Sequence, residues 1–301
     1  MIRTVPVPPA LAGERVDVAV ARLMGLPRTR AAELARAGLV QAGGIKVAKS
    51  ARLEEGQTLR VEVPEPADQP EPVVELPVTY EDSDLIVINK PAGVAAHAGP
   101  GWSGPTVLGS LLAVGVALAT GGPPERRGIV QRLDVGTSGL MMVAKSERAY
   151  SVLKQMFRDR AVDKTYHALV QGLPDPLEGT IDAPIGRVPG AFKFAVLSNG
   201  KSSITHYGLI EAFAGASLLR VDLETGRTHQ IRVHLAAVGH PLVGDPFYGG
   251  DPKLAVRLGL ERQWLHATAL GFDHPVTGQP VRCEAPYSAD LAAALATLRE
   301  S

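Results

Sequence analysis

The pattern of apolar and polar positions in the middle of the chain predicts both strands and helices. Two continuous apolar runs, residues 85–89 (LIVIN) and 139–145 (GLMMVAK), have the length of buried strands. From Ser146 to residue 160 the apolar positions recur instead every three or four residues, and serine is a residue type that caps helix N-termini. The apolar stripe of this predicted helix consists of Ala149, Val152, Leu153, Met156 and Phe157. We expect the stripe to pack in a core.

The first 63 residues contain shorter segments with the apolar spacing of helices and of strands. Two sets of apolar residues recur at helical spacing, one before Pro27 and one after it. The sets are Val16, Val20 and Leu23, then Ala31, Leu34 and Ala35. Gly43-Gly44 favours a turn, and Leu59, Val61 and Val63 then alternate with polar residues as in a half-buried strand. This segment therefore predicts two short helices and a small sheet.

A boundary follows at residues 64–77 (PEPADQPEPVVELP), which contain five prolines and four acidic residues but no Lys or Arg. Such a composition predicts an extended, poorly packed linker. Residues 1–63 hold ten Lys or Arg against six Asp or Glu, whereas residues 78–301 hold twenty-one of each. We therefore expect a small basic domain over residues 1–63 and a large domain over residues 78–301.

The overall composition limits the fold and function classes to which the chain can belong. With 301 residues, of which 45% are hydrophobic and 21% charged, the chain can bury a substantial core. Its formal net charge is zero, so nucleic-acid binding has to be argued from local clusters of charge. Cys283 is the only cysteine, which excludes an intrachain disulfide and a cysteine-based zinc site. The large domain lacks a regular alternation of strands and helices, so we expect the α+β class.

The sequence favours neither export nor membrane insertion. The N-terminus carries prolines where a secretory signal needs an apolar helix. The uncharged apolar run at residues 107–119 is shorter than the ~20 residues that cross a bilayer. We expect a buried helix within this run, no membrane association and a cytoplasmic location.

Three segments of the large domain are rich in reactive residue types: 131–139 (QRLDVGTSG), 164–172 (KTYHALVQG) and 225–249 (TGRTHQIRVHLAAVGHPLVGDPFYG). Asp134 lies in a glycine-punctuated loop before a very apolar strand, where its carboxylate can either cap a turn or act in catalysis. Tyr166 alternates with apolar residues on one strand face. Its ring can therefore be a packing group or face a ligand.

Arg227 precedes an apparent helix, HQIRVHLAAV, which ends before Gly239. A cation beside a helix N-terminus favours an anion or a carboxylate. The histidines of this segment, His229, His234 and His240, also suggest a metal site. However, residues five apart on a helix lie about 140° apart around its axis, so we expect no metal there.

These three segments and residues 89–101 (NKPAGVAAHAGPG), in their order along the chain, resemble the RluA-type family of RNA pseudouridine synthases. This similarity extends over roughly residues 78–284. The segment from Ala12 to Val63, with GLPRTRAAELARAGLVQAGG followed by KSARLEEGQTLRV, resembles the S-four-like (alpha-L) RNA-binding domain. The two resemblances cover nearly the whole chain, and both imply an RNA partner.

The resemblance implies a fold and a site. The fold has a central, mostly antiparallel mixed sheet with an RNA-binding cleft, and it needs no cofactor and no metal. Asp134 aligns with the nucleophilic aspartate of the family, and Tyr166 aligns with the tyrosine that packs on the target base. Arg227 matches the arginine that pairs with the aspartate. Arg132 corresponds to the arginine that enters the RNA stack where the base has left.

The N-terminal domain is expected to add contacts to RNA. The residues expected to make them are Arg28, Arg30, Arg36, Lys46 and Lys49. We therefore expect an isomerase, acting as a monomer, that converts specific uridines of structured RNA to pseudouridine. Large-subunit ribosomal RNA is the expected substrate, and transfer RNA is the alternative.

The chain departs from the family pattern at Gln131, where histidine is usual, and at Val135-Gly136, where a charged pair is usual. The first change bears on how Arg132 is aimed at the RNA, and so on substrate choice. One rival class is an RNA-binding, ribosome-associated protein with a decayed catalytic centre, but Asp134, Tyr166 and Arg227 are all intact. A second rival, a metal-dependent hydrolase, would need its histidine ligands on one helix face.

Overall fold

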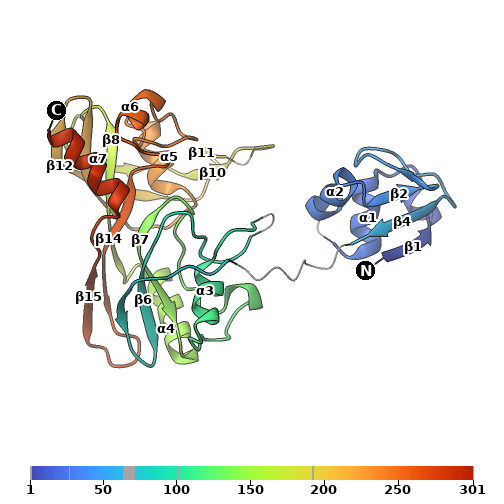
Figure 1. Ribbon diagram of the computed structural model, residues 1–301, viewed down its shortest axis with the longest axis horizontal. Helices are drawn as coiled ribbons and strands as arrows, with labels where there is room; N and C mark the ends of the chain where they lie inside the picture. The colour runs from blue at the N-terminus through green and yellow to red at the C-terminus, as the bar shows by residue number, and fades with distance from the viewer. Residues whose placement is uncertain (1, 27, 64–71, 100–101, 192, 301) are drawn as a thin grey trace. The chain divides into compact units, whose positions relative to one another are not determined.

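The computed structural model of the protein describes residues 2–26, 28–63, 72–99, 102–191 and 193–300. The chain divides into two compact units, Met1–Pro70 and Glu71–Ser301, which Figure 1 shows in blue and in cyan to red. Each unit has hydrophobic core residues of its own.

The N-terminal unit contains a four-stranded antiparallel sheet and two helices in its described residues. The sheet order is β1 (Ile2–Pro6), β4 (Thr58–Glu62), β2 (Val40–Ala42) and β3 (Ile45–Lys46). A 3-10 turn (Pro9–Leu11) precedes helices α1 (Val16–Met24) and α2 (Arg28–Arg36). Leu59 and Val61 are buried and their strand neighbours are not, which confirms the predicted alternation.

The segment expected to be a linker, residues 64–77, lies only partly within the described residues. Residues 64–71 lie outside the described residues. Residues 72–77 have no regular secondary structure, yet Val74 and Leu76 pack against the core of the second unit. The amide of Val74 donates to the hydroxyl of Ser110 at 3.2 Å, and the carbonyl of Pro77 accepts from the amide of Asn89 at 2.8 Å. The prediction of poor packing is therefore wrong for this end, because apolar residues and backbone pairing attach it to the core.

The second unit is built on a nine-stranded mixed sheet, counted over the described residues. Its order is β5 (Val78–Glu81), β6 (Leu85–Lys90), β7 (Ser138–Ala144), β14 (Leu265–Asp273), β8 (Asp163–Gln171), β13 (Ala216–Leu223), β12 (Ile204–Phe213) and β9 (Glu178–Asp182), with β15 (Pro280–Glu284) paired to β14. Strands β7 and β14 run parallel, and the other pairs in this sheet are antiparallel. The expected α+β class with a mostly antiparallel sheet is confirmed.

The helices of this unit cover both faces of the sheet (Figure 1). They are η2 (Pro124–Arg126), α3 (Val107–Ala113), α4 (Glu147–Arg158), α5 (Gln230–Ala237), α6 (Pro252–Arg257) and α7 (Ala289–Arg299). Helix α4 forms as predicted, with the hydroxyl of Ser146 accepting from the amide of Ala149 at 3.1 Å. A separate hairpin, β10 (Ile185–Arg187) and β11 (Phe194–Val196), contacts α5.

Alternating side chains of the strands decide which helix lies on which face. Ile86 and Ile88 of β6 share a core cluster with residues of α3 and α5, whereas Leu85 and Val87 belong to the cluster under α4. Tyr166 of β8 lies in the same cluster as α3 and α5. The face covered by these two helices is therefore the one that carries the candidate site.

Candidate active site

Asp134 lies in the loop that leads into β7, and its carboxylate does not cap that loop. The turn is closed by its main-chain carbonyl, which accepts from the amide of Thr137 at 3.0 Å. The side chain is 16% exposed, and Oδ2 faces Nη1 of Arg232 at 3.4 Å and Nε2 of His229 at 3.8 Å. Within the described part of the chain, Oδ1 has no hydrogen bond. Of the two uses left open by the sequence, the structure thus favours a carboxylate available to a ligand.

Lys90, which is buried, and Arg262, which is partly exposed, hold the backbone just after Asp134. Nζ of Lys90 donates to the carbonyls of Pro91 and Val94 at 2.9 and 2.8 Å, and lies 3.5 Å from the carbonyl of Val135. Nη1 of Arg262 donates to the carbonyl of Gly136 at 2.9 Å. Burial lowers the pKa of Lys90 to about 7, although the charge of Asp134 opposes that shift. The loop is therefore fixed from the inside of the fold.

Arg232 is the arginine that contacts Asp134, and Asp245 holds it in place. Its Nε and Nη2 donate to the two carboxylate oxygens of Asp245 at 2.7 and 2.9 Å. Both side chains are buried, and Asp245 also accepts from the amides of Phe247 and Tyr248. A bidentate pair of this kind fixes the guanidinium plane, so the third nitrogen points at Asp134 in a defined direction.

The expected pairing of Arg227 with Asp134 is therefore wrong. Helix α5 begins at Gln230, so Arg227 lies in the turn before it, is exposed, and donates from Nε to the carbonyl of Ser202 at 3.2 Å. Arg232 lies in the first turn of the helix, on its buried side. An arginine within a run as apolar as IRVHL is a candidate for burial, and a buried arginine needs a carboxylate partner. That signal was present in the sequence and could have identified Arg232.

Tyr166 and Asp134 line one small pocket, together with both arginines predicted for the site. The residues around it include Arg132, Leu133, Asp134, Tyr166, Arg227, His229 and Arg232. Tyr166 is 8% exposed, and burial, helped by the charge of Asp134, raises its pKa above the ordinary value. The side chain is therefore a neutral phenol at physiological pH. Structure thus brings together four predicted residues from three separate segments.

A groove of about 610 Å³ adjoins this pocket, sharing Arg132, Tyr166, Leu223, Gly226 and Arg227 with it. It is strongly basic although the whole chain is neutral. Its lining holds one carboxylate, Glu224, and seven cations: Arg126, Arg132, Lys154, Arg158, Arg160, Lys164 and Arg227. Such a local excess of positive charge favours an anionic polymer as ligand.

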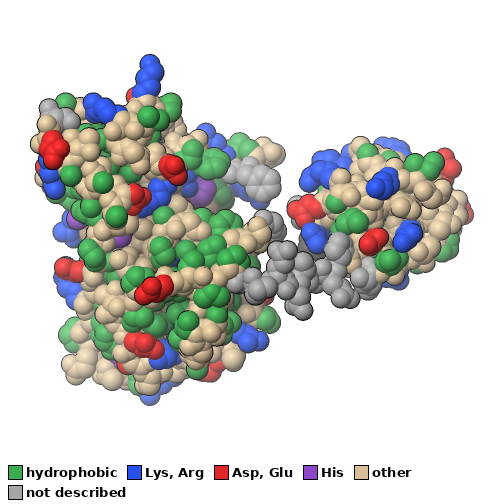
Figure 2. Space-filling view, in the orientation of Figure 1, with side chains coloured by type: hydrophobic (Ala, Val, Ile, Leu, Met, Phe, Trp, Pro, Cys, Tyr) green, Lys and Arg blue, Asp and Glu red, His purple; other side chains and the backbone are tan. Residues whose placement is uncertain are grey.

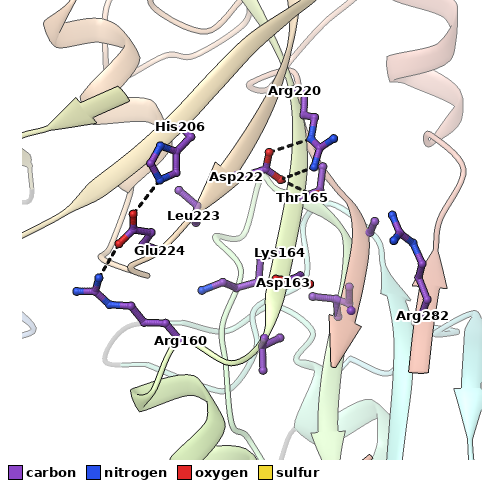
Figure 3. Close-up of a pocket in the computed structure, with 14 residues that line it drawn as sticks. Arg160, Asp163, Lys164, Thr165, His206, Arg220, Asp222, Leu223, Glu224 and Arg282 are labelled. Carbon is purple, nitrogen blue, oxygen red and sulfur yellow. Dashed lines mark hydrogen bonds and ion pairs between the residues drawn. The ribbon is translucent and has the colours of Figure 1, made fainter. Parts of the chain in front are cut away.

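A second hollow lies past Arg160 and Glu224 (Figure 3), and its charges are largely compensated. Arg160 bonds Glu224 at 2.6 Å, and His206 bonds the other oxygen of Glu224 at 2.9 Å. Arg220 bonds Asp222 at 2.8 Å. The two cavities share the Arg160–Glu224 pair, together with Lys164 and Leu223.

The histidines considered as metal ligands have separate partners. His234 bonds the hydroxyl of Thr205 and the carbonyl of Ala183, and His240 bonds the carbonyl of Gln171. Within the described residues, one group of three side chains is close enough to share an ion: Asp82, Asp84 and His274. Nδ1 of His274 accepts from two backbone amides and Nε2 lies 2.7 Å from Asp82, so both ring nitrogens are already used.

The five basic residues predicted to bind RNA from the N-terminal unit are all exposed. Arg28, Arg30 and Arg36 lie on α2, Lys46 lies on β3, and Lys49 lies in the turn that follows. Arg28 is paired with Asp17 at 3.1 Å and Arg30 with Glu33 at 3.3 Å. Figure 2 shows Lys and Arg side chains at several places on this unit. Their role in binding RNA stays a prediction, as does the S-four-like identity of the unit.

No described helix is both long and apolar enough to cross a membrane.

Comparison with known proteins shows the family to which the chain and its fold belong. A model of the RNA pseudouridylate synthase family matches residues 84–237. A protein of Mycobacterium bovis named as an uncharacterized RNA pseudouridine synthase is 58% identical over 99% of this chain and 98% of its own length. The ribosomal large subunit pseudouridine synthase D of Xanthomonas campestris is 39% identical over 99% of this chain and 93% of its own.

A solved structure agrees with these relatives. The human protein "RNA Pseudouridylate Synthase Domain Containing 1" superposes with a TM-score of 0.60 at 28% identity, over 75% of this chain and 90% of its own. The resemblance found in the sequence is therefore confirmed for the family and for the reaction class. This chain belongs to the RluA-type branch of the RNA pseudouridylate synthase family and is an isomerase that acts on RNA.

Proposed function

We propose that this protein converts specific uridines of large-subunit ribosomal RNA to pseudouridine, with Asp134 as the nucleophile. The observation that carries the proposal is the pocket in which the carboxylate of Asp134 lies 3.4 Å from Arg232 and shares its walls with Tyr166 and Arg132. Relatives named ribosomal large subunit pseudouridine synthase D support the choice of RNA. Work on ribosomal RNA would take place in the cytoplasm.

The reaction makes particular demands on the site. The N1–C1′ bond of uridine breaks, the base rotates, and a C5–C1′ bond forms. The hydrogen on C5 leaves as a proton and N1 takes up a proton, so the product is an isomer. An enzyme must hold base and ribose together throughout this sequence, which a covalent bond to a carboxylate achieves.

Asp134 is suited to form that bond. Arg232 faces Oδ2, so the negative charge is stabilised on the side away from the substrate, while Oδ1 is available for attack. Attack at C6 of the uracil and attack at C1′ of the ribose are both compatible with this arrangement. In each case the bond forms from Oδ1 and later breaks with its electron pair returning to the carboxylate.

Tyr166 supplies a flat, neutral wall for the uracil. The ring is buried on β8 between Ala267 of β14 and Val221 of β13, so the neighbouring strands fix its position. Because burial keeps the phenol protonated, its hydroxyl can donate a hydrogen bond to the base while it stays neutral.

The basic groove is the proposed path of the RNA strand. A uridine in structured RNA has to leave its stack to reach a pocket this small, at a cost of a few kcal/mol. Arg132 lines both the pocket and the groove, which suits a side chain that fills the space left by the base. The exposed basic residues of the N-terminal unit are proposed to add phosphate contacts.

Mapping pseudouridine in cellular RNA, with and without the gene, tests this substrate. The proposal predicts that one or a few positions in large-subunit ribosomal RNA lose the modification, and that the gene restores it. Loss confined to transfer RNA would replace the proposed substrate but keep the reaction. An unchanged map would contradict the proposed function.

A further inference from the structure

His229 is the second donor group beside the nucleophile, and its ring is held in an unusual way. Nε2 lies 3.8 Å from Oδ2 of Asp134, the same oxygen that Arg232 faces. The residue stands just before α5 with φ of 58° and ψ of 21°, in the left-handed region. Among the described residues other than glycine, Arg160 is the other one with a positive φ. Such backbone strain persists where the surrounding structure enforces it, and it is concentrated at functional sites.

A chain of hydrogen bonds fixes which ring nitrogen carries the proton. The amide of Phe194 donates to the hydroxyl oxygen of Tyr248 at 3.2 Å. That oxygen lies 2.7 Å from Nδ1 of His229, and within the described residues the hydroxyl has no other hydrogen bond. The hydroxyl hydrogen is therefore best placed on the line to Nδ1, which then accepts. The neutral imidazole must carry its proton on Nε2, the atom that faces Asp134.

Two aromatic rings keep the imidazole in this orientation. Phe194 meets it at 5.8 Å between centroids and 70° between planes, and Tyr248 meets it at 5.5 Å and 81°. Both contacts are edge-to-face. The ring is thus fixed by its backbone, by a hydrogen bond at Nδ1 and by packing. Burial also lowers the pKa of His229, which favours the neutral form with its proton on Nε2.

We infer that His229 is a positioning residue for the nucleophile: its Nε2–H donates to Oδ2 of Asp134 once RNA occupies the pocket, and Tyr248 fixes the tautomer that makes this possible. The inference rests on the proposed function of Asp134. The observed 3.8 Å is too long for a hydrogen bond, and catalytic hydrogen bonds commonly shorten when substrate binds.

The contact serves the covalent step. While Oδ1 is bonded to carbon, Oδ2 is the carbonyl oxygen of an ester. When that bond breaks, the electron pair returns to the carboxylate and negative charge builds on both oxygens. Donors from Arg232 and His229 at Oδ2 then stabilise the leaving carboxylate and keep Oδ1 directed at the substrate. This role affects the rate of pseudouridine formation in the RNA complex and leaves the affinity for RNA unchanged.

Substitutions at His229 separate the effect of losing the Nε2–H donor from the effect of disturbing the left-handed backbone. His229→Asn suits the left-handed conformation, because asparagine tolerates it, but its side chain is too short to replace Nε2. His229→Gln carries an amide N–H further out. Tyr248→Phe removes the hydroxyl that fixes the tautomer and leaves the imidazole in place. His240→Asn is the matched control, since it makes the same change outside the pocket.

The measurement uses total RNA from cells that lack the gene, with protein in excess, and follows the single-turnover rate of pseudouridine formation. Binding to a transcript of large-subunit ribosomal RNA is measured in parallel. We expect His229→Asn to lower the rate about 10- to 100-fold with unchanged affinity, and His229→Gln to recover part of it. Tyr248→Phe should lower the rate by about threefold to tenfold, and His240→Asn should match the wild type.

Two results would overturn the inference. A wild-type rate in His229→Asn would show that the donor is not used. A loss of affinity with an unchanged rate at saturating protein would make His229 an RNA contact instead. Failure of the proposed function is separate, because in that case the wild-type protein itself forms no pseudouridine. Thermal melting of each variant shows whether a lost rate reflects unfolding.

Discussion

Nη1 of Arg232 lies 3.4 Å from Oδ2 of Asp134, although the two residues are 98 positions apart in the chain. The contact joins the loop before β7 to the first turn of α5, and Asp245 fixes Arg232 from the opposite side with two hydrogen bonds. The carboxylate of Asp134, the proposed nucleophile, therefore faces an arginine that a buried ion pair holds in place. This arrangement makes Asp245, which does not line the pocket, important for both stability and rate.

Asp245→Asn should weaken the protein and slow the reaction. The change leaves the guanidinium of Arg232 buried without its carboxylate, which costs about 3 kcal/mol of the free energy of unfolding. It also frees Arg232 to move, so we expect a fall of at least about tenfold in the rate of pseudouridine formation. Urea denaturation and single-turnover assays measure the two effects. Asp251→Asn is the control, because asparagine caps α6 about as well as aspartate does.

Lys90 should make stability depend on pH. Its pKa in the folded protein is about 7, against 10.5 for a lysine in an unfolded chain. Between these values the unfolded chain binds a proton that the folded protein lacks, so stability rises with pH across that window, by at most about 1.4 kcal/mol per pH unit. Below pH 7 both states bind the proton and the dependence disappears.

Lys90→Met isolates this effect. The free energy of unfolding of the wild type, minus that of the variant, should rise between pH 7 and pH 9. Other titrating groups are common to both proteins, so they cancel in the difference. A difference that stays flat over this range would contradict a depressed pKa for Lys90.

The basic groove predicts how RNA affinity responds to salt. Arg158 lines the groove near the C-terminal end of α4, whereas Arg148 is exposed on the same helix and lies outside the groove. Arg158→Ala should lower RNA affinity and reduce the slope of log affinity against log salt by about 1. Arg148→Ala should change neither. Equal effects of the two variants would show that the groove is not the path of the RNA.

The N-terminal unit should contribute affinity for RNA, with little effect on the chemistry. Replacing Lys46 and Lys49 by alanine removes two exposed cations outside the helices. We expect weaker binding to large-subunit ribosomal RNA, a shallower salt dependence, and an unchanged single-turnover rate at saturating protein. If affinity is unchanged, these two lysines do not contact the RNA.

Local patterns in the sequence were enough to predict much of this fold. The apolar runs of β6 and β7 and the Ser146-capped stripe of α4 depend on near neighbours, and all three form as expected. Val74 and Leu76 show the limit of such reasoning. Their segment has the composition of a linker, but whether it packs depends on core residues that are distant in the sequence.

The site, too, has features that the sequence predicts and features that depend on tertiary contacts. The resemblance and the reactive segments brought out Asp134, Tyr166 and Arg132, which share one pocket. Which arginine faces Asp134 depends on where α5 begins and how it is rotated, and for this reason the sequence predicted Arg227 in place of Arg232. The left-handed backbone of His229 and its hydrogen bond to Tyr248 depend on a tertiary contact between residues 19 positions apart. The spacing of apolar residues in the sequence does not predict this contact.

Asp134→Asn tests the proposed role of Asp134 as the nucleophile most directly. The substitution keeps the size of the side chain but removes the charge and the nucleophilic oxygen pair. Asp273→Asn, at the exposed end of β14, is the matched control. We expect purified Asp134→Asn to form pseudouridine in RNA at least about 1,000-fold more slowly than the wild type, while RNA binding and the melting temperature are retained and the control is fully active. Full activity of a folded Asp134→Asn protein would contradict the proposed role.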